Sequence, residues 1–163
     1  MPENRIQVGD RIPDAVLRTM SDEGPVELEA SEFFKGKKVV VFAVPGAFTP
    51  TCNHHLPTYV ENAEAIKAKG VDEIACLAVN DPFVMGAWSR AQEAEGKVTM
   101  LSDGNAEFSA ALGMTFDGSG FGLGARSHRY AMIVDDGKVT ALNMEEAPGA
   151  CTVSSGAAIL DSL

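Results

Sequence analysis

The sequence predicts a single α/β domain over residues 1–163, with a central mixed sheet flanked by helices. Apolar runs alternate with helix-compatible segments, and two late apolar runs are separated only by Asp135-Asp136-Gly137. Strands that alternate with helices favour a parallel sheet covered on both faces, whereas a short turn containing Gly favours an antiparallel hairpin. A chain of 163 residues, 45% of them apolar, is long enough to bury one sizeable core.

The N-terminal part of the chain leads into a strongly apolar strand. We expect two short strands, over residues 15–17 and 25–28, and a helical turn over residues 31–34. The following run, residues 39–44, has no charge and is mostly β-branched or aromatic. Such a run suits a strand that is buried on both faces of a parallel sheet. A Pro-Gly pair then ends it at a turn.

The segment after this strand predicts a helix that extends to about Lys69. The Thr and Pro residues at positions 49 to 51 are typical of a helix start. Apolar residues recur at a spacing of three, and Gly70 is suited to end the helix. We expect Pro57 to kink it, because proline lacks an amide hydrogen. The apolar stripe consists of Val60, Ala63 and Ile66.

The rest of the chain continues the alternation and closes with a hairpin and a helix. The pattern predicts, in order, strand 73–79, a helix from Asp81-Pro82 to about 94, strand 98–101, helix 105–112, loop 117–124, hairpin strands 130–134 and 138–142, and a last helix to 163 capped by Ser154 or Ser155. This order is the pattern of a thioredoxin-like fold. The loop, DGSGFGLG, lacks the G-x-G-x-x-G spacing and opens no helix, so we do not interpret it as a phosphate-binding loop.

Composition and charge exclude several kinds of partner. The net charge is -10 at pH 7 and the isoelectric point is near 4.6. Such a surface repels phosphate backbones and anionic lipids, so we expect neither nucleic acid nor membrane partners. The N-terminal segment MPENRIQVGDRIP resembles neither a signal peptide nor a transit peptide, which predicts a cytoplasmic protein. Three cysteines without a C-x-x-C motif or a His-rich cluster predict neither a disulfide framework nor a zinc site.

Cys52 falls in the first turn of the helix that follows the apolar strand. There, unpaired backbone N–H groups and the positive end of the helix dipole stabilise an anion, which can lower the pKa of a thiol from about 8.5 towards or below neutrality. Position alone also allows Cys52 to be a small buried hydrophobe. A dithiol oxidoreductase is disfavoured, because Thr49 stands where a C-x-x-C motif has its first cysteine.

Four segments together point to one family. They are PGAFTPTC at residues 45–52, HLP at 55–57, KGVDEIACLAVNDPFVMGAW at 69–88 and RSHRYAMIVDDGKVTALN at 126–143. Over nearly its whole length the chain resembles the type II, peroxiredoxin-5-like peroxiredoxins of the thioredoxin-like superfamily. The resemblance implies a thiol-dependent peroxidase that reduces hydrogen peroxide and alkyl hydroperoxides in antioxidant defence and redox homeostasis, without metal, flavin or haem. The alternative is a non-catalytic redox sensor or holdase that is switched by oxidation of Cys52.

The resemblance also implies roles for individual residues. Cys52 corresponds to the peroxidatic thiolate, which peroxide oxidises to a sulfenic acid. Thr49 corresponds to a hydrogen-bonding partner of the peroxide, and Pro45 to a wall that keeps water out. Arg129 corresponds to the cation beside the thiolate, and Arg126 to a supporting residue behind the pocket. From the residues alone, an arginine entering a strand is more often a solvated charge at a sheet edge.

Two adjacent histidines follow the cysteine. We expect packing or surface positions for His54 and His55 rather than a catalytic role, because a preformed thiolate needs no general base. Neighbouring side chains point about 100° apart on a helix, so at most one of them faces the site. Relatives generally have three residues between the cysteine and His-Leu-Pro, whereas here only Asn53 and His54 intervene. The shorter spacing predicts loss of a π-bulge from the helix.

Recycling and assembly are the last expectations. Cys76 lies in an apolar run and is expected to be buried and inert, which leaves Cys151 as the internal candidate for a resolving cysteine. We favour a one-cysteine cycle driven by glutathione or glutaredoxin over a disulfide between Cys52 and Cys151, and thioredoxin is the other candidate reductant. The resemblance implies a homodimer that pairs near the active-site loop, with Phe48 and Phe83 in the interface.

Overall fold

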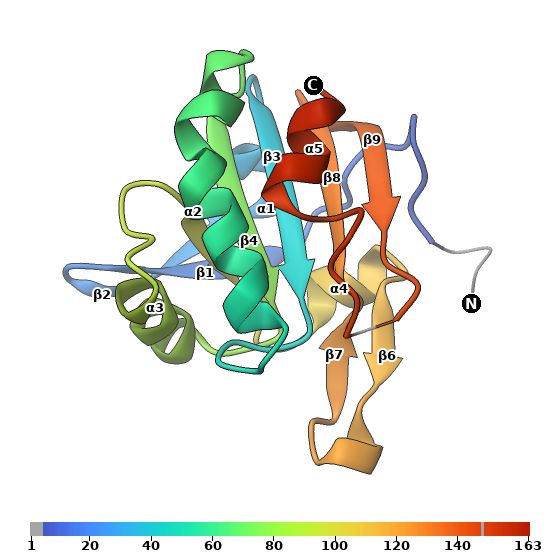
Figure 1. The fold of residues 1–163 in the computed structure, drawn as a ribbon. Helices are drawn as coiled ribbons and strands as arrows, with labels where there is room; N and C mark the ends of the chain where they lie inside the picture. The colour runs from blue at the N-terminus through green and yellow to red at the C-terminus, as the bar shows by residue number, and fades with distance from the viewer. Residues whose placement is uncertain (1–4, 148) are drawn as a thin grey trace.

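A seven-stranded mixed sheet runs through the centre of the molecule (Figure 1). The computed structural model describes residues 5–147 and 149–163, so residues 1–4 of the segment used to predict a cytoplasmic location lie outside it. The strand order is β2-β1-β5-β4-β3-β8-β9; β3, β4 and β5 are parallel, and the other neighbours are antiparallel. The strands are β1 (Val16–Ser21), β2 (Gly24–Glu29), β3 (Lys38–Val44), β4 (Glu73–Ala78), β5 (Thr99–Ser102), β8 (Tyr130–Asp135) and β9 (Lys138–Met144).

Helices cover both faces of this sheet, which confirms the predicted architecture. Three helices pack on one face and two on the other (Figure 1). In the part of the chain that is described, no helix is long and apolar enough to cross a membrane. The first face carries α2 (Cys52–Ala68), α3 (Pro82–Ala91) and α5 (Gly156–Asp161); the second carries α1 (Ala30–Phe33) and α4 (Glu107–Ala111).

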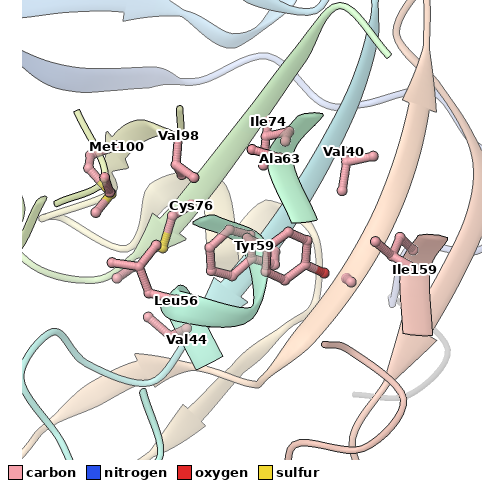
Figure 2. Packing of buried hydrophobic residues seen from close by; sticks show 14 of the residues in the cluster. Val40, Val44, Leu56, Tyr59, Ala63, Ile74, Cys76, Val98, Met100 and Ile159 are labelled. Atoms are coloured by element: carbon pink, nitrogen blue, oxygen red, sulfur yellow. The ribbon is translucent and has the colours of Figure 1, made fainter. Parts of the chain in front are cut away.

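Strand β3 is buried on both faces, as its apolar run predicts. Successive side chains of a strand point to opposite faces, and β3 divides its residues between two core clusters. On the α2 face, the Phe42 ring stacks on Tyr59 with ring centroids 3.8 Å apart, and Figure 2 shows Tyr59 and Leu56 of α2 in this cluster with Cys76 of β4. The β3 residues of that face are Val40, Phe42 and Val44; those of the opposite face are Val39, Val41 and Ala43.

The side-chain caps predicted for α3 and α5 are present, whereas α2 begins without one. Asp81 accepts a hydrogen bond from the Val84 amide at 2.8 Å, and Pro82 is the first residue of α3. Of the two serines proposed to cap the last helix, Ser155 does so, because its hydroxyl accepts from the Ala158 amide at 3.1 Å. These side chains satisfy amides that have no partner within the helix.

Helix α2 contains Pro57 and is nevertheless α-helical from Cys52 to Ala68. No π-turn interrupts it, as the short spacing between Cys52 and His55 predicts. The predicted kink at Pro57 stays a prediction. Gly70 has a φ of 94°, a conformation that glycine adopts readily, and the helix ends just before it.

The interpretation of residues 117–124 as a plain loop missed a small hairpin. Strands β6 (Thr115–Asp117) and β7 (Ala125–Ser127) form a separate two-stranded antiparallel sheet, and Ser119–Phe121 forms a 3-10 helix between them. Each strand has three residues, which is too short for an alternating pattern to be visible. The hairpin leads directly into Arg129 and β8.

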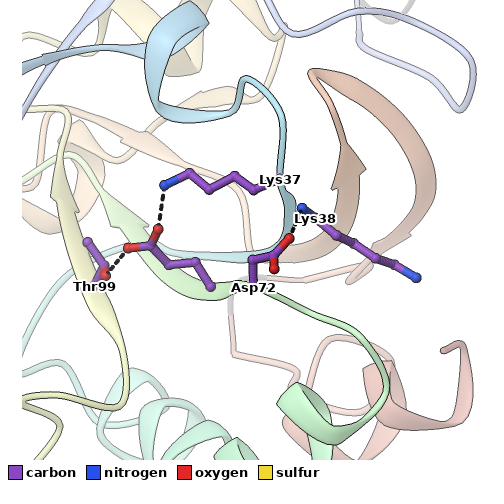
Figure 3. Close-up of polar contacts among 5 residues, drawn as sticks. Lys37, Lys38, Asp72 and Thr99 are labelled. Atoms are coloured by element: carbon purple, nitrogen blue, oxygen red, sulfur yellow. Dashed lines mark hydrogen bonds and ion pairs between the residues drawn. The ribbon is translucent and has the colours of Figure 1, made fainter.

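Polar contacts tie together the starts of the three parallel strands (Figure 3). The Glu73 carboxylate receives Lys37 Nζ at 2.6 Å on one oxygen and the Thr99 hydroxyl at 2.6 Å on the other. Beside it, Asp72 accepts from the Lys38 amide at 2.8 Å. The loops that follow these strands lie at the opposite edge of the sheet, at the carboxyl ends of the strands. In open α/β sheets, binding sites lie at that edge.

Candidate active site

The side chain of Arg126, on β7, stabilises the loop between β3 and α2. Arg126 donates from Nη1 to the Pro45 carbonyl at 3.1 Å and from Nε to the Leu123 carbonyl at 3.0 Å. A Cβ atom on Gly46 would lie 2.5 Å from Arg126 Nη1, so the guanidinium lies directly against the loop backbone. The Ala47 amide completes the support by donating to Asn80 Oδ1 at 2.9 Å.

Cys52 is the first residue of α2, and its side chain is fully buried. The predicted position in the first helical turn is confirmed, so Sγ lies at the positive end of the helix dipole. Thr51 precedes it without capping the helix through its side chain; its hydroxyl instead donates to the Gly149 carbonyl at 3.3 Å. Thr49 donates its hydroxyl hydrogen to the Gly46 carbonyl at 2.7 Å, which leaves the oxygen lone pairs available as acceptors.

Arg129 is buried and contacts Cys52. The residue is 2% exposed, and its Nη2 donates to Cys52 Sγ at 3.0 Å. The alternative interpretation of Arg129 as a solvated charge at a sheet edge is therefore wrong. Arg129 directly precedes β8, and β8 pairs with β3 in the central sheet. Because α2 begins shortly after β3 ends, this pairing brings Arg129 close to the start of α2. A guanidinium remains charged in proteins, so it provides a permanent cation beside the sulfur.

His55 lies on the other side of the Arg129 guanidinium. Nδ1 of His55 is 2.7 Å from Arg129 Nη1, and Nε2 is 2.8 Å from the Ser154 carbonyl oxygen. Because a guanidinium only donates, Nδ1 must accept, and the ring proton must be on Nε2. Burial, with a further contribution from the Arg129 charge, lowers the pKa of His55 to about 4, against the effect of the Ser154 carbonyl. The ring is therefore neutral at physiological pH.

The Ser154 carbonyl is a shared acceptor in this network. It receives Tyr59 Oη at 2.6 Å as well as His55 Nε2. Glu145 in turn accepts from the Ser154 amide at 2.8 Å and from the Ser154 hydroxyl at 2.6 Å. Hydrogen bonds thus connect Glu145, the residue after β9, to Arg129, the residue before β8. The connection runs through Ser154 and His55.

The two other cysteines are free thiols in different surroundings. Cys76 is fully buried in β4, and burial raises its pKa well above the ordinary thiol value, with a smaller effect of Cys52 in the same direction. Its predicted burial is confirmed. Cys151 is half-buried; burial raises its pKa, while the Arg129 charge acts in the opposite direction. Neither thiol is in a disulfide with Cys52.

The sequence predicted some of the residues at this site and missed others. The prediction for His54 is confirmed, because its side chain is exposed. His55 is packed as expected, but its contact with Arg129 was missed, although a spacing of three residues from Cys52 places both side chains on one face of a helix. Glu145 and Ser154 were missed because no local pattern marks them; only the pairing of β8 with β9 and the return of the chain before α5 bring them to the site.

Comparisons with known proteins agree with this geometry. The Redoxin family model matches residues 7–160. Peroxiredoxin-2E-2, chloroplastic, of Oryza sativa subsp. japonica is 50% identical over 165 residues, covering 97% of this chain and 72% of that protein. Peroxiredoxin-2B of Arabidopsis thaliana is 44% identical over 160 residues, covering 97% and 98%.

A solved structure extends the similarity to three dimensions. Reduced Prx3 from Vibrio vulnificus, in complex with H2O2, is 53% identical and superposes with a TM-score of 0.91, covering 96% of this chain and 98% of that one. The fold and the family predicted from the sequence are confirmed. The chain therefore belongs to the Redoxin family and, within it, to the type II peroxiredoxins, which are thiol-dependent peroxidases with a thioredoxin-like fold.

Proposed function

We propose that Cys52 is the peroxidatic residue and that it reduces hydrogen peroxide and alkyl hydroperoxides. The contact that carries this proposal is the 3.0 Å approach of Arg129 Nη2 to Cys52 Sγ in a fully buried setting. The thiolate attacks one peroxide oxygen, so that an S–O bond forms while the O–O bond breaks. The departing alkoxide or hydroxide takes up a proton and leaves as alcohol or water, and Cys52 becomes a sulfenic acid. The similar Prx3 of Vibrio vulnificus binds H2O2, which supports peroxide as the substrate.

The neighbouring residues have distinct roles in this proposal. Arg129 stabilises both the thiolate and the negative charge that develops on the departing oxygen. Thr49, whose hydrogen is donated to Gly46, accepts a hydrogen bond from the peroxide O–H and so aligns the O–O bond. Pro45 walls the pocket and offers no N–H group, and Arg126 fixes it through its carbonyl.

We further propose a one-cysteine cycle. A thiol attacks the Cys52 sulfenic acid and releases water, and a second thiol then reduces the mixed disulfide and restores Cys52. Glutathione with glutaredoxin is the proposed reductant, and thioredoxin is the alternative. The support for this proposal is that hydrogen bonds hold the segment around Cys151 on both sides, at Gly149 and at Thr152, so that Cys151 has little freedom to approach Cys52.

Assembly as a homodimer and a cytoplasmic location complete the proposal. Phe48, in the loop between β3 and α2, is 48% exposed, and Phe83 on α3 is 64% exposed. The Phe48 ring lies 6.5 Å from that of Trp88, which is also on α3, and large exposed aromatic side chains favour a protein contact. Cell fractionation tests the proposed location.

Stopped-flow peroxide consumption tests the proposed nucleophile. Wild-type protein should react far faster than free cysteine, Cys52→Ser should lose the reaction, and Cys151→Ser should retain the fast first step. A wild-type rate near that of free cysteine would instead favour the non-catalytic sensor or holdase. A fast reaction in Cys52→Ser would assign the chemistry to another thiol.

A further inference from the structure

Glu145 is a buried carboxylate with no part in the reaction described above. It is 5% exposed and directly follows β9. Its backbone amide donates to the Arg129 carbonyl at 3.0 Å, so it lies opposite Arg129 where β8 and β9 pair. A buried carboxylate is costly unless it is fully hydrogen-bonded, and such a group in a small domain calls for an explanation.

The carboxylate holds the segment that precedes α5. One oxygen accepts from the Thr152 amide at 2.8 Å, the Ser154 amide at 2.8 Å and the Ser154 hydroxyl at 2.6 Å; the other accepts from the Thr152 hydroxyl at 3.2 Å. Burial acts to raise the pKa of Glu145, but these hydrogen bonds from Ser154 and Thr152 outweigh it and lower the pKa. Glu145 is therefore ionised at physiological pH, and its bonds are charge-assisted.

These bonds determine where the Ser154 carbonyl points. With its amide and hydroxyl both held by Glu145, Ser154 presents its carbonyl to His55 Nε2. That contact fixes the ring proton on Nε2 and leaves Nδ1 as an acceptor for Arg129 Nη1. The other terminal nitrogen of the same rigid, planar guanidinium then faces Cys52 Sγ.

We propose that Glu145 is a positioning residue for the peroxidase reaction, which acts through Ser154 and His55 to hold the Arg129 guanidinium against Cys52 Sγ. The inference rests on the proposed roles of Cys52 and Arg129. In this proposal the Glu145 carboxylate orients the Arg129 guanidinium without touching it.

Removing the Glu145 charge has two opposite effects on the thiolate, and their signs distinguish the roles. If charge alone mattered, removing a carboxylate would favour a thiolate, so the midpoint of Cys52 alkylation would fall or stay unchanged. As a positioning residue, Glu145 keeps Arg129 in place, so its loss would make Cys52 ionise at higher pH. A purely structural role would change the melting temperature and move neither the ionisation of Cys52 nor its reactivity.

The test compares Glu145→Gln with Glu146→Gln, which removes the same charge from an exposed neighbour. The ionisation of Cys52 is followed by its rate of alkylation against pH, with the modified peptide identified by mass. We expect the midpoint for Glu145→Gln to move to higher pH and the peroxide rate constant at pH 7 to fall about tenfold or more, since a charge-assisted network is lost. Glu146→Gln should match wild type. A midpoint that is unchanged or lower, with a wild-type rate, would overturn the proposal.

Two further variants keep the test decisive if Glu145→Gln folds poorly. Ser154→Ala keeps the backbone carbonyl and amide but loses one bond to Glu145, so we expect a smaller change of the same sign. His55→Ala should slow the reaction, whereas His55→Asn, which restores an acceptor beside Arg129, should recover part of the rate. Failure of both expectations would overturn the proposal. The alkylation readout needs no peroxide, so it reports on Arg129 positioning even if Cys52→Ser were to retain peroxidase activity and refute the proposed nucleophile.

Discussion

Arg129 and Cys52 are far apart in the sequence, yet Arg129 Nη2 donates to Cys52 Sγ across 3.0 Å, with both side chains shielded from solvent. A cation held this close to a sulfur in a medium of low polarity interacts with it much more strongly than it would in water. The pair forms only when the loop after β3 and the entry to β8 are both correctly placed. The central sheet provides that placement, because β3 and β8 are neighbours in it.

Arg129→Ala should slow peroxide reduction by roughly 100- to 1000-fold, the range typical for loss of one oriented donor to a developing oxyanion. Stopped-flow kinetics at pH 7 provides the measurement, and thermal unfolding separates a catalytic loss from a folding defect. Arg18→Ala is a suitable control, because Arg18 forms only a partly exposed ion pair with Glu27 at 3.1 Å. An Arg129→Ala rate equal to wild type would remove the residue from the mechanism.

Thr49→Val should reduce the rate less than Arg129→Ala, because the hydroxyl aligns the peroxide and carries no charge. The same substitution also releases the Gly46 carbonyl from its 2.7 Å bond. Thr49→Ser retains the hydroxyl and should stay close to wild type. If Thr49→Val and Thr49→Ser are equally slow in stopped-flow assays, the methyl group rather than the hydroxyl is what matters.

The free energy of unfolding should decrease as the pH falls below neutrality, because the folded protein keeps His55 neutral. Its folded-state pKa is depressed from 6.5 to about 4, mainly by burial, so the unfolded chain binds a proton first as the pH falls. The contribution is fully present above pH 6.5 and is lost as the pH falls towards 4, by about 3 kcal/mol in total. Chemical denaturation at several pH values should show a shallower pH dependence for His55→Asn. His54→Asn, at an exposed position, should keep the wild-type slope.

Peptide mass mapping after one equivalent of peroxide, with no added thiol, should find sulfenic acid at Cys52. The reason is that hydrogen bonds restrain the segment carrying Cys151, whereas bridged cysteines need Cα atoms within about 7 Å. Cys151→Ser should then keep full turnover with glutathione and glutaredoxin. A stoichiometric peptide linking Cys52 to Cys151 would show instead that the segment opens during the cycle and that Cys151 resolves the sulfenic acid.

Phe83→Asp should shift the protein towards monomer in sedimentation experiments at tens of micromolar, a concentration suited to a micromolar interface. The exposed aromatic ring is the kind of side chain that a protein contact buries, and a carboxylate there would be left without a partner. Val26→Asp, at an exposed position on edge strand β2, is the control for an added charge. Wild-type protein that sediments only as monomer would count against the dimer.

Much of the fold could be predicted because its signals are local. The apolar run of β3, the cap at Asp81 and the turn at Asp136-Gly137, where both residues have positive φ, are each recorded within a few residues. The β6–β7 hairpin was missed, because three-residue strands leave too few positions to show a period. The glycines between the two strands suggested a loop. The pairing of β6 with β7 across that loop is not encoded in either short strand alone.

The site was predictable only where its residues lie in one helix or one motif. Cys52 and its helix start follow from the sequence around them, and His55 follows Cys52 by one helical turn. The contact between Glu145 and Ser154 depends on where the chain returns after β9, and no local spacing encodes that return. The family resemblance supplied Arg129, but the residues that hold its guanidinium had to come from the structure.

Helix α5 contacts α2 closely at Gly156. The Gly156 amide donates to Thr58 Oγ1 at 2.9 Å, and a Cβ atom at Gly156 would collide with the Thr58 carbonyl. Thr58 lies one turn beyond His55 on the same helix. We therefore expect a deletion of α5, or a bulky group fused to it, to loosen Ser154 and, through His55, to weaken the contact between Arg129 and Cys52 at the start of α2.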